Sequence, residues 1–86
     1  MAAYSIFFKD SVRKDLAAIP KGDLQRIMER IAGLADNPRP AGCEKLSGQE
    51  KYRLRQGNYR IIYSIQDSQL TVWVVKVGHR REVYRT

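Results

Sequence analysis

The sequence predicts an α+β domain in which a helical hairpin packs on one face of a small, mainly antiparallel sheet. Two observations support this fold class. Apolar residues repeat at helical spacing through the first half of the chain, and the period shortens to about two after residue 50. The chain has 86 residues, which is the size of one domain, so we expect a single domain over residues 1–86.

A short strand followed by a helix is expected at the start of the chain. Residues 4–8 are rich in β-forming side chains, which predicts the strand. Asp10 can accept hydrogen bonds from the free N–H groups of a helix, so we expect a helix that begins at Ser11. The apolar face of this helix is formed by Val12, Leu16 and Ile19. Since proline suits the first helical turn, Pro20 is expected to close this helix and open the next.

The second helix has the stronger amphipathic pattern. Its apolar residues recur at helical spacing and are Leu24, Ile27, Met28, Ile31 and Leu34. The polar residues between them fall on the other side and include Arg26, Glu29 and Arg30. We therefore expect two antiparallel helices joined at Pro20.

The second half of the chain predicts three consecutive strands after a loop over residues 36–50, which holds prolines and glycines. The strands are expected at residues 52–55, 59–65 and 70–77, with turns at residues 56–58 and 67–68. Gly78 is expected to end the last strand. This strand is apolar on both parities, which indicates a central position with cover on both faces.

Alternation within the strands predicts a basic sheet face opposite the helices. Arg53 and Arg55 fall on one side of their strand, and Tyr52 and Leu54 fall on the other. In the next strand, Arg60, Ile62 and Ser64 share a side, opposite Tyr59, Ile61, Tyr63 and Ile65. Arg80 and Arg81 follow the last strand and are expected at the edge of this basic face.

The net charge of +7 is concentrated in the second half of the chain. Residues 51–86 hold eight basic and two acidic side chains, and six of the eight are arginines. Such a field attracts polyanions, and arginine is suited to bidentate contact with phosphate. The charge distribution therefore favours a partner such as RNA, DNA or an acidic protein segment.

Several classes of site and of protein are excluded by composition. One cysteine and one histidine leave little room for a zinc site or a nucleophile with its base. The sequence lacks phosphate-binding glycine motifs, and its basic half lacks clustered carboxylates for metal ions. It shows no signal peptide and no apolar run of membrane-spanning length. We therefore expect a cytoplasmic domain without cofactor, metal or membrane.

Metal-free chemistry on RNA fits what remains. RNA carries its own nucleophile, the 2′-hydroxyl, so an enzyme needs to align it, stabilise a doubly charged phosphorane and move protons. Arginines supply the stabilisation. Proton transfer would fall to Tyr84, His79, Lys51 or Glu82, and the residues alone leave this choice open.

Two segments, YRLRQGNYRIIYSI and LTVWVVKVGHRREVYR, resemble the RelE/ParE toxin superfamily, and the resemblance covers nearly the whole chain. It implies a RelE-like fold and the toxin of a type II toxin–antitoxin module. RelE-type toxins are ribosome-dependent endoribonucleases that cleave mRNA in the A site by 2′-hydroxyl attack without a metal. The implied partners are a RelB-like antitoxin, the ribosome and mRNA, with operator DNA bound only by the toxin–antitoxin complex. The alternative is a ParE-like, non-enzymatic inhibitor of DNA gyrase.

The resemblance also implies roles for individual residues. The catalytic set is Arg60, Arg80, Tyr84, Arg53 and Lys51. Within it, Arg60 and Arg80 stabilise the phosphorane, and Arg81 is an alternative to Arg80. The general base is Tyr84, His79 or Lys51. Contacts to RNA are expected from Arg55, His79, Arg81, Lys76 and Arg85.

Overall fold

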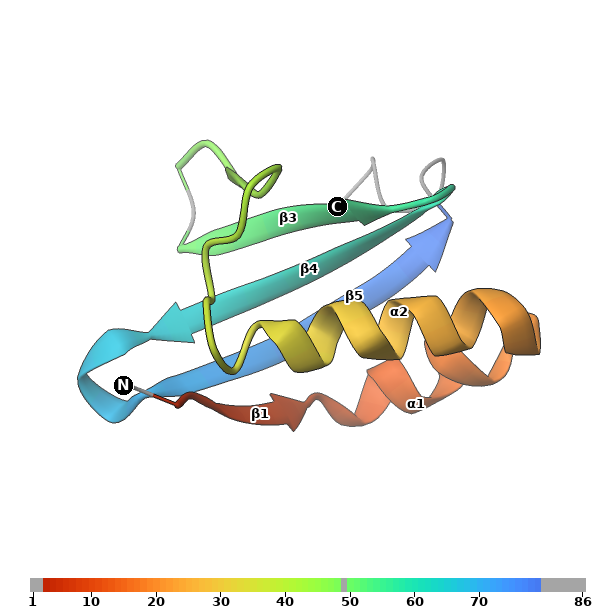
Figure 1. Cartoon of the computed structure of the whole chain (residues 1–86), viewed down its shortest axis with the longest axis horizontal. Helices are drawn as coiled ribbons and strands as arrows, with labels where there is room; N and C mark the ends of the chain where they lie inside the picture. The colour runs from red at the N-terminus through yellow and green to blue at the C-terminus, as the bar shows by residue number, and fades with distance from the viewer. Residues whose placement is uncertain (1–2, 49, 80–86) are drawn as a thin grey trace.

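The computed structural model describes residues 3–48 and 50–79 as two helices beside one sheet (Figure 1). In chain order the elements are β1 (Ser5–Phe8), α1 (Asp10–Ala17), α2 (Lys21–Gly33), β2 (Glu44–Lys45), β3 (Lys51–Gln56), β4 (Tyr59–Gln66), a 3₁₀ turn (Asp67–Gln69) and β5 (Thr71–His79). The predicted α+β class and helical hairpin are confirmed. Within the described ranges, neither helix is long and apolar enough to cross a membrane.

The five strands form one mixed sheet in the order β1-β5-β4-β3-β2. Strands β2 to β5 pair in antiparallel fashion, and β1 pairs with β5 in parallel. The sheet is thus mainly antiparallel, as predicted. The short strand β2 lies inside the segment that we predicted to be loop, because two residues carry too little periodicity to be recognised.

The central position predicted for β5 is confirmed, but its cover on both faces is not. Trp73 is 41% exposed and stacks on Phe7 of β1, with ring centroids 5.1 Å apart. These two residues face each other in the β1–β5 register. An apolar strand next to an edge can therefore leave an aromatic pair partly in contact with solvent.

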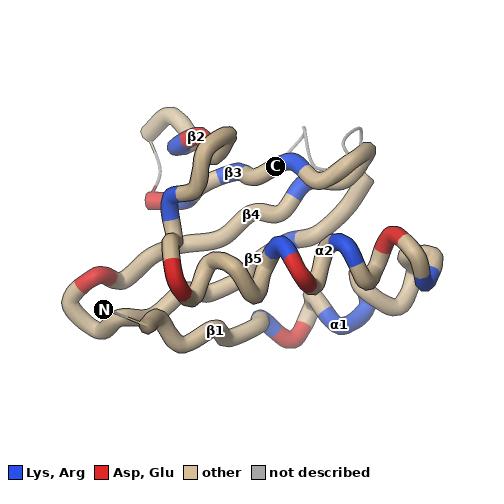
Figure 2. Tube along the Cα trace, in the orientation of Figure 1, with Lys and Arg blue, Asp and Glu red and all other residues tan. Residues whose placement is uncertain are grey.

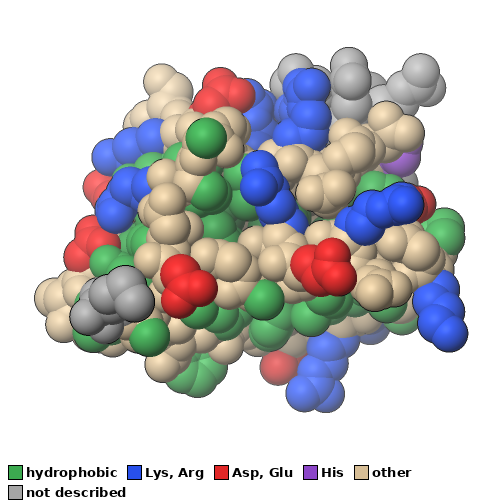
Figure 3. Space-filling view, viewed as in Figure 1, with side chains coloured by type: hydrophobic (Ala, Val, Ile, Leu, Met, Phe, Trp, Pro, Cys, Tyr) green, Lys and Arg blue, Asp and Glu red, His purple; other side chains and the backbone are tan. Residues whose placement is uncertain are grey.

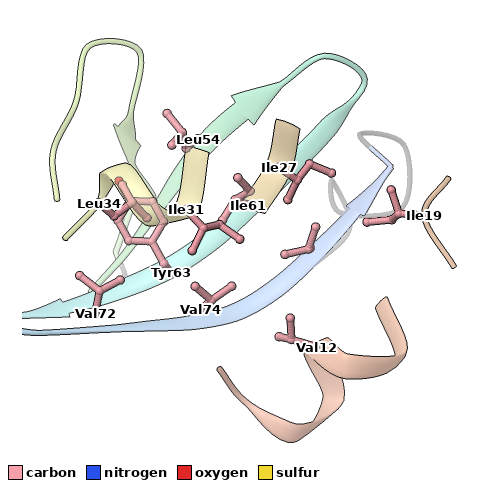
Figure 4. Close-up of a cluster of buried hydrophobic side chains, with 11 residues drawn as sticks. Val12, Ile19, Ile27, Ile31, Leu34, Leu54, Ile61, Tyr63, Val72 and Val74 are labelled. Atoms are coloured by element: carbon pink, nitrogen blue, oxygen red, sulfur yellow. The ribbon is translucent and has the colours of Figure 1, made fainter. Parts of the chain in front are cut away.

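The core lies between the helices and one face of the sheet. Figure 4 shows Ile27 and Ile31 of α2 among core residues of β3, β4 and β5, with Val12 contributed by α1. Its buried members are Val12, Ile19, Ile27, Ile31, Leu34, Leu54, Ile61, Tyr63, Val72, Val74 and Val77. The helical and strand periods read from the sequence therefore identify the core-facing residues.

Some predictions at element ends are wrong: β5 continues through Gly78, which we expected to end it, and closes at His79. The helix α1 begins at Asp10 itself, and Lys9 occupies the capping position without a side-chain hydrogen bond. Asp10 instead places its carboxylate in the first turn, where negative charge favours the helix dipole. Leu70 has a φ of 48°, so it completes the turn before β5 rather than starting the strand.

A hydrogen-bonded cluster fastens the loop after α2 to the far end of the sheet. Arg39 donates to both carboxylate oxygens of Asp67, at 3.2 and 2.9 Å, and to the Tyr52 hydroxyl at 3.2 Å. Tyr4 donates to Asp67 Oδ1 at 2.7 Å. The hydrogen bonds from Arg39 and Tyr4 hold the pKa of Asp67 below its usual range, and the bond to Asp67 raises the pKa of Tyr4.

Replacing Asp67 with asparagine is expected to lower thermal stability at neutral pH, because Arg39 and Tyr4 lose a charged acceptor. A carboxyl whose pKa is lowered by folding stabilises the protein above its unfolded pKa of about 3.9. That contribution disappears as the pH falls through the lower, folded value. The melting temperatures of wild type and Asp67→Asn should therefore differ at pH 7 and converge in acid. The control is Asp36→Asn, which changes an exposed aspartate near the same loop; an equal effect of both variants would contradict the assignment.

Candidate nucleic-acid interface

Four arginines from three elements line one cavity of about 330 Å³. Arg53 and Arg55 come from β3, Arg60 comes from β4 and Arg30 comes from α2. Gly42 and Glu44, from the loop after α2 and from β2, complete the lining. Figure 2 shows basic positions along α2, β3 and β4, and Figure 3 shows basic side chains from α2 to the β3 side of the molecule.

The strand register explains why three of these arginines meet. Arg55 faces Arg60 directly across the β3–β4 pair, and Arg53 faces Ile62. Alternation then places all three arginines on the side of the sheet opposite Leu54 and the core. The sequence prediction that Arg53, Arg55 and Arg60 share a face is confirmed.

The prediction of a basic sheet face needs a correction at its centre. Arg60 is 1% exposed and Ile62 is 5% exposed, so this part of the face is buried. Arg53 is partly covered, and Arg55 is exposed. The arginines therefore form a graded site, with one buried guanidinium and two more accessible ones, rather than a flat charged surface.

One carboxylate lies among the four guanidinium groups. Glu44 Oε1 is 3.3 Å from Arg53 Nη2, and Glu44 faces Arg53 in the β2–β3 register. Within the described part of the lining, four positive charges against one negative charge leave a strong excess, which favours an anion with several oxygens. Among residues 3–48 and 50–79, no group of three or more histidine, cysteine or acidic side chains could hold a metal ion.

Three other predicted site residues lie outside this cavity. Lys51 is exposed at the start of β3, facing Ser64, on the same face as Arg53. Lys76 lies on β5, and its ammonium group is 3.1 Å from Asp15 Oδ1 of α1. The structure therefore brings neither lysine to the cavity lining, and Lys76 is already engaged in an ion pair.

His79 also lies apart from the arginines. It faces Tyr59 across the β4–β5 pair, and the two rings meet edge to face with centroids 5.8 Å apart. His79 lines a second cavity of about 280 Å³, together with residues of α1. Its expected contact with the same RNA as Arg60 is not supported by this placement.

The remaining predicted residues, Arg80, Arg81, Tyr84 and Arg85, lie outside the described residues. Near the end of β5, Gly78 faces Arg60 across the β4–β5 pair. The strand that leads to these four residues therefore passes beside Arg60.

Sequence reasoning missed Arg30 and Glu44. Arg30 was assigned to the polar side of the second helix, but it lies three residues after Ile27 and four before Leu34, which are both buried. That spacing puts Arg30 at the border of the buried stripe, so the sequence could have indicated that Arg30 is partly buried. Glu44 gave no such signal, because its position depends on the pairing of β2 with β3.

The chain is also similar to known proteins along nearly its whole length. A family model described as "ParE toxin of type II toxin-antitoxin system, parDE" matches residues 6–84. The toxin RelG of Mycobacterium tuberculosis is 33% identical, over 95% of this chain and 97% of its own length. The mRNA interferase toxin RelE of Escherichia coli K12 is 28% identical, over 95% of this chain and 90% of its own length.

Solved structures show the same fold. The chain is similar to the toxin–antitoxin complex RelBE2 of Mycobacterium tuberculosis, with a TM-score of 0.81 and 30% identity over 91% of this chain and 99% of that one. It is also similar to the archaeal RelE–RelB complex of Pyrococcus horikoshii, with a TM-score of 0.82 and 30% identity over 93% and 97% of the two chains.

Proposed function

Because the chain belongs to the ParE toxin family of type II toxin–antitoxin systems, and so is a RelE/ParE-superfamily toxin, we propose that it cleaves mRNA in the ribosomal A site as a metal-free endoribonuclease. The observation that carries this proposal is the meeting of Arg53, Arg55 and Arg60 at one cavity. Guanidinium groups held beside a phosphodiester stabilise the charge that develops when the RNA 2′-hydroxyl attacks it.

The burial of Arg60 supports its role at the scissile phosphate. A buried guanidinium acts in a medium of low dielectric constant, so its interaction with a developing charge is stronger than in water. Arg53 and Arg55 are more accessible and would bind and orient the RNA backbone. Arg80 and Tyr84 complete the proposed site, as second phosphate ligand and general base, on the strength of the family resemblance.

The proposed general base is Tyr84 or Lys51. His79 lies on the α1 side of β5 and lines a different cavity, which disfavours it. Lys51 shares a face with Arg53, so it stays available beside Tyr84. Tyrosine has a reference pKa of about 10, and neighbouring guanidinium groups would lower the pKa of Tyr84.

A RelB-like antitoxin is the proposed partner that keeps the toxin inactive. The similar structures from Mycobacterium tuberculosis and Pyrococcus horikoshii are both toxin–antitoxin complexes. An antitoxin segment bound in the arginine cavity would neutralise its charge and prevent RNA from binding. The same binding would stabilise the folded toxin. Binding of operator DNA is proposed only for the complex of both chains.

The function is tested with purified toxin and ribosomes that hold a defined mRNA. We expect primer extension to show cuts at codon spacing, in the A site, also in the presence of EDTA. Addition of the antitoxin should abolish them. Intact mRNA on ribosomes occupied by the toxin would overturn the proposal.

The description of the matching family names ParE, so inhibition of DNA gyrase is the alternative. The same preparation is therefore added to a gyrase supercoiling assay. Inhibited gyrase with uncut mRNA would assign the chain to the non-enzymatic class. Cut mRNA with active gyrase would assign it to the nucleases.

A further inference from the structure

Arg30 lines the cavity, but the proposed cleavage step assigns no role to its positive charge. It is half-buried on α2, and its Nε is buried without a hydrogen-bond partner among the described residues. A buried N–H donor that lacks a partner costs free energy, unless a ligand supplies the acceptor. The side chain also reaches the loop after α2, since a Cβ built on Gly42 would lie 4.0 Å from Arg30 Nη2.

The number of guanidinium groups exceeds what one phosphodiester can use. Each arginine presents several N–H donors in a planar fork, whereas a phosphodiester offers two non-bridging oxygens. Among the described residues, the cavity is lined by three arginines of β3 and β4 and by one arginine of α2. This arrangement suits two consecutive phosphates of one strand better than a single phosphate.

We propose that Arg30 binds a second phosphate of the RNA, next to the scissile one, and so positions the strand in the cavity. The proposal rests on the proposed function, because that function assigns Arg60 to the scissile phosphate. Arg30 is a positioning residue in this role, since it does not touch the reacting atoms. Glu44 holds Arg53 in the absence of RNA and is exchanged for a phosphate when the strand enters.

RNA is favoured over an acidic protein segment by the chemistry of the lining. Apart from Glu44, the charged side chains of the described lining are arginines, whose fork matches phosphate in a bidentate manner. Among the described residues, the lining other than Gly42 is charged, and it offers no apolar side chain of the kind that a bound peptide would contact.

The test compares Arg30→Gln with Arg26→Gln in the full chain. Both changes remove one arginine charge from α2, and the two positions are one turn apart. Arg26 is exposed and pairs with Asp23 at 3.9 Å, outside the cavity. The probe is a fluorescent single-stranded RNA with 2′-O-methyl groups, which prevents cleavage, and binding is measured by anisotropy without ribosomes over a range of salt concentrations.

We expect Arg30→Gln to weaken binding about tenfold and Arg26→Gln to change it less than about twofold. The slope of log K against log salt should fall by about 0.7 for Arg30→Gln alone, the value for one phosphate contact of a single strand. Thermal unfolding shows whether each variant is folded. Should Arg30→Gln not fold, Arg30→Lys keeps the charge and the stem but loses Nε, and a drop in affinity of at least about threefold is expected.

Three results would overturn the proposal. They are equal effects of the Arg30 and Arg26 variants, no binding of the probe by wild type at low salt, and weakened binding of the antitoxin with unchanged binding of RNA. The last result would assign the cavity to the antitoxin. The binding assay needs no cleavage, so the two proposals can fail separately. If binding of the probe depends on Arg30 but mRNA on ribosomes stays intact, the proposed function is wrong and the phosphate site is kept.

Discussion

Replacing Arg60 with lysine is expected to slow mRNA cleavage by about 10²–10³-fold while the chain stays folded. Lysine keeps a positive charge on a long stem, but it is a point charge and cannot present two parallel N–H groups to a phosphate. The loss should appear in kcat rather than in KM, because the interaction strengthens only as charge develops in the transition state. Single-turnover cleavage on programmed ribosomes measures the effect.

Lysine is the informative substitution here because Arg60 is 1% exposed. Alanine would also leave a void in the interior, so loss of activity could follow from loss of packing. Arg26→Lys, at an exposed position of α2, is the matched control and should cleave at the wild-type rate. Normal cleavage by a folded Arg60→Lys variant would remove Arg60 from the mechanism.

Replacing Ile31 with alanine is expected to lower the free energy of unfolding by about 2–5 kcal/mol. Ile31 is 1% exposed and lies between α2 and the sheet, where the deletion leaves a cavity that the neighbouring side chains fill only in part. A domain of this size has little stability to spare, so the loss should also reduce the amount of folded toxin in cells.

Met28→Ala is the control for this substitution. Met28 lies on the same helix but is 38% exposed, so its removal should cost less than about 1 kcal/mol. Urea unfolding followed by circular dichroism measures both variants. Equal destabilisation by the two changes would mean that the buried stripe of α2 does not hold the helix on the sheet.

The order of elements and the core could be read from residue periods, because they depend on near neighbours in the chain. The apolar spacing of α2 identified Ile27, Ile31 and Leu34, all of which are buried. The alternation of β3 and β4 placed Arg53, Arg55 and Arg60 on one face, and the pairing of Arg55 with Arg60 confirms it. Element ends were less predictable, as Asp10 and Leu70 show, because one or two residues carry little periodic signal.

The tertiary structure decided how deeply each charged side chain is buried and which other side chains lie beside it. Period and charge are the same for a solvated arginine and for Arg60, yet Arg60 is buried. Arg30 joins the cavity from α2, and Glu44 joins it through a strand of two residues, by contacts between segments far apart in sequence. Lys76 and His79 are likewise drawn to α1 and Tyr59. Residue type and spacing thus determine what chemistry is possible, whereas packing between distant segments determines which groups share one site.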